Sequence, residues 1–141
     1  MAGALMHSVE IQAEPRRVYE ALATGEGLAS FWTRDSKAEP RTGTVAEFGF
    51  GGPRLRMRVD ELAPDRRVRW TTLGDFPNWE GTTVAWDLKA ADGKTEVQFA
   101  HDGWAAELPQ RDLASVNYTW AQILGRLKAF AESGRPDPYF P

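Results

Sequence analysis

Alternation of apolar and polar residues is the feature of this sequence that most restricts its fold. Five segments place apolar side chains at every second position: residues 7–13, 54–62, 66–73, 82–90 and 94–101. In the second of these, RLRMRVDEL, Leu55, Met57 and Val59 share one face, and the residues between them are charged. A period of two with one polar face is typical of an antiparallel sheet that is covered on one side only.

Weaker strand signals and turn sequences complete this sheet. Residues 44–50 predict a further strand, and residues 36–40 predict a weak one. Turn-forming residues separate the strands at Pro40–Gly43, at Ala63–Asp65 and at Asp92–Gly93. The strands therefore follow one another as hairpins.

Helical periodicity appears in three places. Residues 15–24 and 26–32 predict two short helices, and residues 110–133 predict a long one. The long segment carries one apolar stripe, made of Val116, Trp120, Ile123, Leu124 and Leu127. Such a helix can cover the apolar face of the sheet. Because no repeat or linker is visible, we expect a single domain over 1–141, with 135–141 as an extended tail that folds back on the body or touches a partner.

The composition excludes several classes of protein. The 141 residues carry a net charge of −3 with scattered Lys and Arg, which argues against a nucleic-acid-binding protein. Cysteine is absent, so disulfides and a cysteine nucleophile are excluded. No apolar run approaches the ~20 residues of a membrane span, and the start MAGALMHS does not resemble a signal peptide. We expect a cytoplasmic protein.

Aromatic residues gather at one end of the predicted sheet. Consecutive hairpins alternate between the two ends, and the short polar turns share one of them. The other end receives the exit of the second helix, the turn at 50–53, the loop around 76–79 and the segment after the last strand. These pieces carry Phe31, Trp32, Phe50, Phe76, Trp79 and Trp104. The arrangement predicts an apolar mouth, as small-molecule pockets usually have.

The order of these elements resembles a known fold. The matching pieces are VEIQAEPRRVYEALATGEGLASFW, ELAPDRRVRWT, GKTEVQFAHDGW and YTWAQILGRLKAF. Together they resemble the START-like (SRPBCC) superfamily, and in particular the C-terminal domain of activators of the heat-shock-protein ATPase. The resemblance implies an α+β helix-grip fold, in which a curved seven-stranded antiparallel sheet wraps a long C-terminal helix. It also implies a cavity between the two, but it does not select one function, because the superfamily includes binders, transporters, cyclases and chaperone regulators.

From the mouth and the resemblance, we expect a small apolar or amphipathic ligand between sheet and helix. The predicted walls are Phe48, Phe50, Met57, Trp70, Trp86, Phe99 and Trp120, and the predicted entrance residues are Phe31, Trp32, Trp79 and Trp104. Ordinary core packing is the alternative, and it is favoured for Trp70, Trp86, Phe99 and Trp120, because alternation alone accounts for their burial.

Two histidines share the inward parity of the first and last strands. If Val9 faces Phe99, His7 lies opposite His101. Such a pair could act as a proton shuttle or as half of a metal site, but two structural histidines are the favoured alternative. No third ligand is evident, so neither a metal nor another cofactor is predicted. A cyclase- or lyase-type enzyme would use His101 with Tyr118 or Glu80. A non-enzymatic role is favoured, and the remaining alternatives are a chaperone regulator and a homodimer.

Arginines mark the outer face of the sheet. They are Arg54, Arg56, Arg58, Arg67 and Arg69, and Asp60 and Asp87 share their parity. We expect a solvated surface with paired charges, and docking of an acidic partner protein is the alternative.

Overall fold

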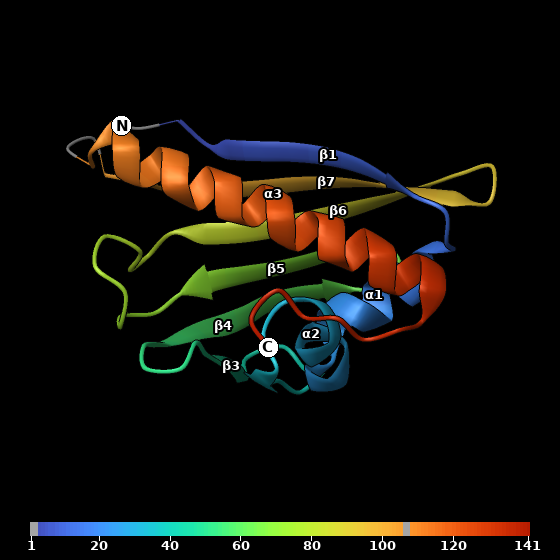
Figure 1. Ribbon diagram of the computed structural model, residues 1–141, viewed down its shortest axis with the longest axis horizontal. Coiled ribbons are helices and arrows are strands. Elements are labelled where there is room, and N and C mark those ends of the chain that lie inside the picture. Colours follow the sequence, from blue (N-terminus) through green and yellow to red (C-terminus); the bar gives the residue numbers. More distant parts are fainter. Residues whose placement is uncertain (1–2, 106–107) are drawn as a thin grey trace.

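A computed structural model describes residues 3–105 and 108–141 (Figure 1). In chain order the elements are β1 (Leu5–Ile11), α1 (Pro15–Ala23), α2 (Gly25–Phe31), β2 (Asp35–Lys37), β3 (Val45–Gly49), β4 (Arg54–Ala63), β5 (Arg67–Thr72), β6 (Thr83–Ala91), β7 (Lys94–Asp102) and α3 (Gln110–Ser133). This order confirms the predicted α+β fold, including the two short helices between the first two strands.

The strands form one antiparallel sheet in the order β1-β7-β6-β5-β4-β3-β2. Burial alternates along the strands, as in β5, where Val68, Trp70 and Thr72 are buried and the residues between them are partly exposed. The pairing of β4 with β5 shifts between Val59 and Glu61, and such a bulge bends a strand. The apolar face of the sheet lies against α3, which crosses it from end to end (Figure 1).

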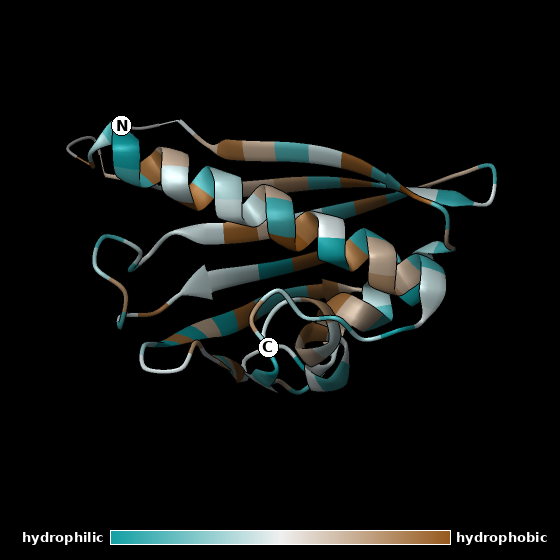
Figure 2. Cartoon of the chain, in the orientation of Figure 1, coloured by the Kyte–Doolittle hydropathy of each residue, from teal (hydrophilic) through white to brown (hydrophobic). Residues whose placement is uncertain are grey.

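The long helix α3 packs on the sheet through its apolar stripe. Trp120, Ile123, Leu124, Leu127 and Ala131 are buried on it. In Figure 2, brown bands of hydrophobic residues recur along α3 between teal and white bands.

The two short helices fill the space beside the C-terminal half of α3. Both contact α3, and α1 also contacts β5, β6 and β7. They can lie close together because Gly27 has no side chain: a Cβ there would come within 2.4 Å of the Ala21 backbone. Gly134, with φ 76°, ends α3 in the left-handed conformation and reverses the chain.

Charged residues on the outer face of the sheet pair with one another, as the sequence predicts. Most of the outer arginines have an acidic partner within this chain. The pairs are Arg54–Asp35 at 2.9 Å, Arg56–Asp75 at 2.9 Å, Arg58–Asp60 at 2.8 Å and Arg67–Asp87 at 3.1 Å. These internal partners reduce the positive charge that an acidic partner protein would meet.

No helix in residues 3–105 and 108–141 is both long enough and apolar enough to cross a bilayer.

Candidate functional site

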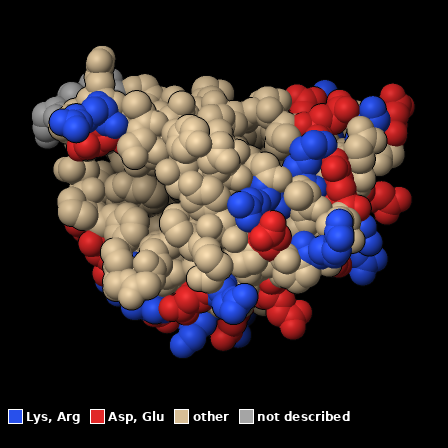
Figure 3. Space-filling view, viewed as in Figure 1, with Lys and Arg blue, Asp and Glu red and all other residues tan. Residues whose placement is uncertain are grey.

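An apolar cavity of about 270 Å³ lies under the N-terminal half of α3. In Figure 3 the surface is hollowed below this part of the helix, and the rim is mostly free of charged side chains. The lining residues come from β4, α3, three connecting segments and the C-terminal tail: Trp32, Phe50, Leu55, Phe76, Trp79, Ser115, Val116, Thr119, Trp120, Ile123 and Phe140. The predicted aromatic end of the sheet is therefore where the cavity lies.

Aromatic contacts join the segments around the opening. Phe50, in the turn between β3 and β4, lies 5.7 Å from Phe76 in the loop between β5 and β6. Phe76 in turn lies 5.2 Å from Trp79 in the same loop. On its other side Phe50 meets Phe140 of the C-terminal tail edge-on, with 4.9 Å between ring centroids. Distant parts of the chain thus share one apolar rim.

The loop that carries Phe76 and Trp79 is held by an ion pair at its base. Arg56 donates two hydrogen bonds to the Asp75 carboxylate, at 2.9 and 3.3 Å. The hydrogen bond from Arg56 lowers the pKa of Asp75, so the pair stays charged well below neutral pH. Asp75 has φ 91°, a conformation that is rare outside glycine. The ion pair offers one reason why the loop keeps this turn.

A buried hydrogen-bonded chain lies beside the cavity and connects α3 to this loop. Trp120 donates its indole N–H to Nδ1 of His101 at 3.0 Å, and Nε2 of His101 lies 2.9 Å from the Thr82 hydroxyl. That hydroxyl donates to the carbonyl oxygen of Trp79 at 2.6 Å. The chain therefore positions two residues of the cavity wall, Trp120 and Trp79.

The same bonds fix the protonation state of His101. An indole N–H can only donate, so Nδ1 accepts and the single ring proton is on Nε2. A second proton on Nδ1 would face the N–H of Trp120. The ring is fully buried, and burial lowers its pKa to about 3. His101 is neutral at physiological pH, and the nitrogen that a general base would use is occupied.

Four of the eleven predicted ligand-contacting residues line the cavity: Trp32, Phe50, Trp79 and Trp120. Six others lie in the packed core beneath it and do not line it: Phe31, Phe48, Met57, Trp70, Trp86 and Phe99. The aromatic rings among them contact one another, as those of Trp86 and Phe99 do with 4.8 Å between centroids. They occupy the volume that the prediction left hollow.

Trp104 differs from its predicted place at the entrance. Only 1% of it is exposed, and its indole N–H donates to the carbonyl oxygen of His101 at 3.0 Å. Its ring packs 4.2 Å from the imidazole of His101 and 5.7 Å from Trp79. Trp104 thus supports the wall from behind.

Seven lining residues were absent from the predicted set: Leu55, Phe76, Ser115, Val116, Thr119, Ile123 and Phe140. Val116 and Ile123 belong to the apolar stripe of α3, and Phe76 lies in a loop at the predicted mouth. These three could have been found from the sequence. Phe140 could not, because nothing in the tail sequence shows where it docks.

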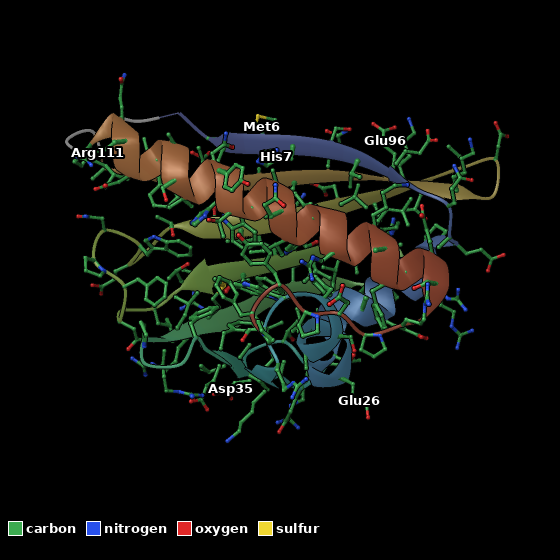
Figure 4. The ribbon with its side chains drawn as sticks, in the orientation of Figure 1. Met6, His7, Glu26, Asp35, Glu96 and Arg111 are labelled. Carbon is green, nitrogen blue, oxygen red and sulfur yellow. The ribbon has the colours of Figure 1, made fainter. Side chains whose placement is uncertain are left out.

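The predicted pairing of His7 with His101 is wrong. In the structure His7 pairs with Phe99, and Leu5 pairs with His101. A shift of two residues keeps every side chain on the same face, so the alternating pattern could not reveal it. Met6 and His7 lie on opposite faces of β1 (Figure 4), and His7 is half-buried.

Tyr118 and Glu80 do not approach His101 as the enzyme hypothesis required. Tyr118 is 63% exposed on α3, and Glu80 is exposed in its loop. Among the described residues, no cluster of three His, Asp or Glu side chains is placed to hold a metal ion.

Several solved structures have a similar fold, and each matches nearly the whole of this chain. The Aha1 dimer from Colwellia psychrerythraea is 32% identical, with a TM-score of 0.85, and the match covers 95% of this chain and 98% of that one. DynU16, described as a putative protein in the dynemicin biosynthetic locus, is 24% identical with a TM-score of 0.78; the match covers 96% of this chain and 49% of that one. Protein BH1534 of Bacillus halodurans is 18% identical with a TM-score of 0.79, and the match covers 93% of this chain and 98% of that one.

Comparison with curated proteins gave no match. A family model, described as Activator of Hsp90 ATPase homolog 1-like protein, matches residues 12–132. This match confirms the resemblance on which the fold prediction was based. The chain belongs to the Activator of Hsp90 ATPase homolog 1-like family.

Proposed function

We propose that this protein binds a small, uncharged, largely apolar molecule in the cavity under α3. The observation that carries the proposal is the wall itself. Six aromatic rings line it, together with Leu55, Val116 and Ile123, and none of the lining residues is charged. Pockets for small molecules are usually apolar and concave, with few polar groups.

The volume of the cavity limits the ligand. An apolar cavity of roughly 150 Å³ holds benzene, so about 270 Å³ suits a molecule of roughly ten to twelve non-hydrogen atoms. Ser115 and Thr119 supply the hydroxyl groups of the wall, and Thr119 already donates to the carbonyl oxygen of Ser115 at 3.0 Å. A charged group buried here would lose its hydration without gaining a partner. A ligand with a polar end would have to keep that end at the opening of the cavity.

A titration with naphthalene tests the proposal. We expect saturable shifts of the methyl NMR signals of Val116 and Ile123, which line the cavity. Val116→Phe places a ring in the cavity and should abolish the shift of the Ile123 methyl signals, which remain as the reporter in that variant. Tyr118→Phe, on the exposed side of the same helix, should leave the shifts unchanged. Methyl signals that do not respond to naphthalene, or respond equally in Val116→Phe, would contradict the proposal.

Catalysis through His101 gains little support from the site. Both ring nitrogens are engaged by Trp120 and Thr82, and Tyr118 and Glu80 are exposed. We therefore propose binding, not a cyclase- or lyase-type reaction, as the role of the cavity.

Regulation of a heat-shock ATPase is a second candidate, and family membership favours it. The relative from C. psychrerythraea carries the name Aha1, and its match with this chain is nearly complete in length. If the candidate is right, the protein should co-purify with a heat-shock ATPase and raise its rate of ATP hydrolysis. An unchanged hydrolysis rate at saturating protein would exclude it.

Self-association is a further partner prediction. The C. psychrerythraea relative was solved as a dimer, and light scattering of this protein would show whether it shares that state. The cytoplasmic location remains a prediction from the sequence.

A further inference from the structure

The C-terminal strap, residues 135–141, returns along the molecule after α3 ends. In Figure 1 it runs back from the end of α3 across α2, and the C-terminus lies near the middle of the molecule. Three of its backbone amides donate to carbonyl oxygens at the end of α2. Asp137 donates to Ser30 at 2.9 Å, Tyr139 to Phe31 at 3.1 Å, and Phe140 to Trp32 at 2.9 Å. In the other direction, the backbone amide of Arg34 donates to the carbonyl oxygen of Phe140 at 3.0 Å. The strap thus has a fixed register on the chain segment that carries Trp32.

Phe140 is the part of the strap that reaches the cavity. It lines the cavity opposite α3 and meets Phe50 edge-on at 4.9 Å. Tyr139 instead packs against Arg126, with 5.8 Å between the Tyr139 ring centre and the guanidinium carbon. One wall of the cavity is therefore supplied by the last residues of the chain.

Arg126 of α3 fastens the strap. Its Nη1 donates to the carbonyl oxygens of Asp137 and Pro138, at 3.1 and 3.4 Å, and lies 3.2 Å from the Asp137 carboxylate. The Asp137 side chain is largely exposed and that of Arg126 is partly exposed, so the ion pair is weak. Beyond Arg126, the strap is held by its backbone hydrogen bonds to residues 30–34 and by the rings of Tyr139 and Phe140, which are partly buried, whereas residues 135–137 are exposed. No residue of the strap is fully buried, unlike those of β4 and α3 in the other walls, and such a segment opens at lower free energy than a packed sheet or helix.

From these contacts we infer that the C-terminal strap is the displaceable wall of the cavity, and that Phe140 sets the largest ligand the cavity accepts. This inference rests on the proposed binding function. Ligands that fit behind Phe140 bind with the strap closed. Larger flat molecules must displace its ring, at the cost of its contact with Phe50. Arg126 controls how often the strap opens.

Two neutral probes of different size, naphthalene and pyrene, test the inference with Phe140→Ala. Removing the ring should strengthen pyrene binding by about tenfold or more and weaken naphthalene binding by a few fold, because one probe gains room and the other loses a wall. Arg135→Gln is the matched control: among the described residues its side chain makes no hydrogen bond or ion pair. It should change neither affinity.

A measurement without ligand tests separately whether Arg126 holds the strap closed. Hydrogen exchange at the Phe140 amide should become about tenfold faster in Arg126→Gln than in Arg135→Gln, whereas amides within β7 should exchange equally in both.

The outcomes separate the two proposals. If naphthalene binds but Phe140→Ala leaves the pyrene-to-naphthalene preference unchanged, the strap inference is wrong and the binding function stands. If neither probe binds the wild type or Phe140→Ala, both are overturned. Equal exchange of the Phe140 amide in the two arginine variants would show that Arg126 does not hold the strap closed.

Discussion

The two halves of α3 cover different kinds of interior. Under the C-terminal half, Leu124, Leu127 and Ala131 are at most 3% exposed and pack into a continuous core. Under the N-terminal half, Val116 is only partly buried, and a cavity of about 270 Å³ separates the helix from the loops at that end of the sheet. The same helix and the same sheet thus produce a filled region and a hollow one.

The difference follows from where the short helices lie. Both α1 and α2 pack beside the C-terminal half of α3 and fill the gap that a sheet and one helix leave (Figure 1). At the other end no further helix of the described residues packs under α3, and the space is bordered mainly by connecting segments and the C-terminal strap. Loops can border a space with aromatic rings without filling it, which places the cavity at this end.

The largest expected effect separates the two halves directly. Leu127→Ala should lower the free energy of unfolding by about 2–5 kcal/mol, because it opens a void in a packed core. Val116→Ala should cost less than about 1 kcal/mol, because its side chain already borders empty space. Urea denaturation of both variants measures the two values. Equal losses would mean that the halves are packed alike.

The buried histidine beside the cavity predicts a pH effect of intermediate size. The pKa of His101 is about 3 in the folded protein, and close to 6.5 when unfolded. The unfolded state therefore binds more protons between these values, and stability falls as the pH drops through that window. Between about pH 7 and pH 4.5 the loss should be roughly 2–3 kcal/mol.

His101→Gln isolates this contribution. A glutamine amide can accept from Trp120 and donate to Thr82, but it does not titrate in this range. Acid unfolding curves of the two proteins should therefore diverge below about pH 6.5. Parallel curves would show that His101 is not held neutral by burial.

Enlarging a side chain should have opposite effects in the two halves. Val116→Phe should raise the free energy of unfolding by about 0.5–1 kcal/mol, because it fills an apolar space. Leu124→Phe should lower it by about 1–3 kcal/mol, because the core there has no room. Thermal denaturation of the pair would show the signs, and destabilisation of similar size in both would contradict the contrast.

The smallest effect is expected outside both regions. Tyr118 is 63% exposed on α3, so Tyr118→Ala should change stability by less than about 0.5 kcal/mol. Naphthalene affinity should not change. A marked loss of binding, measured by the same methyl NMR titration, would show that the ligand lies on the outer surface of α3.

The sequence predicted the fold well because its strongest signals are periodic. Alternation identified the long strands, and the stripe from Val116 to Leu127 identified the helix that covers them. Hairpin order also located the aromatic end, where Phe50, Phe76 and Trp79 do meet.

The details of the site were harder to predict, because they depend on packing across distant segments. Alternation shows that Trp70 and Trp86 face inward, but it does not show whether their rings fill the interior or border a space. The register of β1 on β7 is not fixed by a hairpin turn, so His7 was misplaced by two residues. The docking of Phe140 depends on hydrogen bonds between backbone groups, which no side-chain pattern reveals.

Xenon binding tests most directly whether α3 covers one filled region and one apolar space. A crystal of the protein under xenon pressure should show the gas between Val116, Ile123 and Trp79, since apolar cavities of this kind take up xenon. The region under Leu124 and Leu127 should remain free of it. Xenon in that second region, or its absence from both, would contradict the contrast from which the binding function is argued.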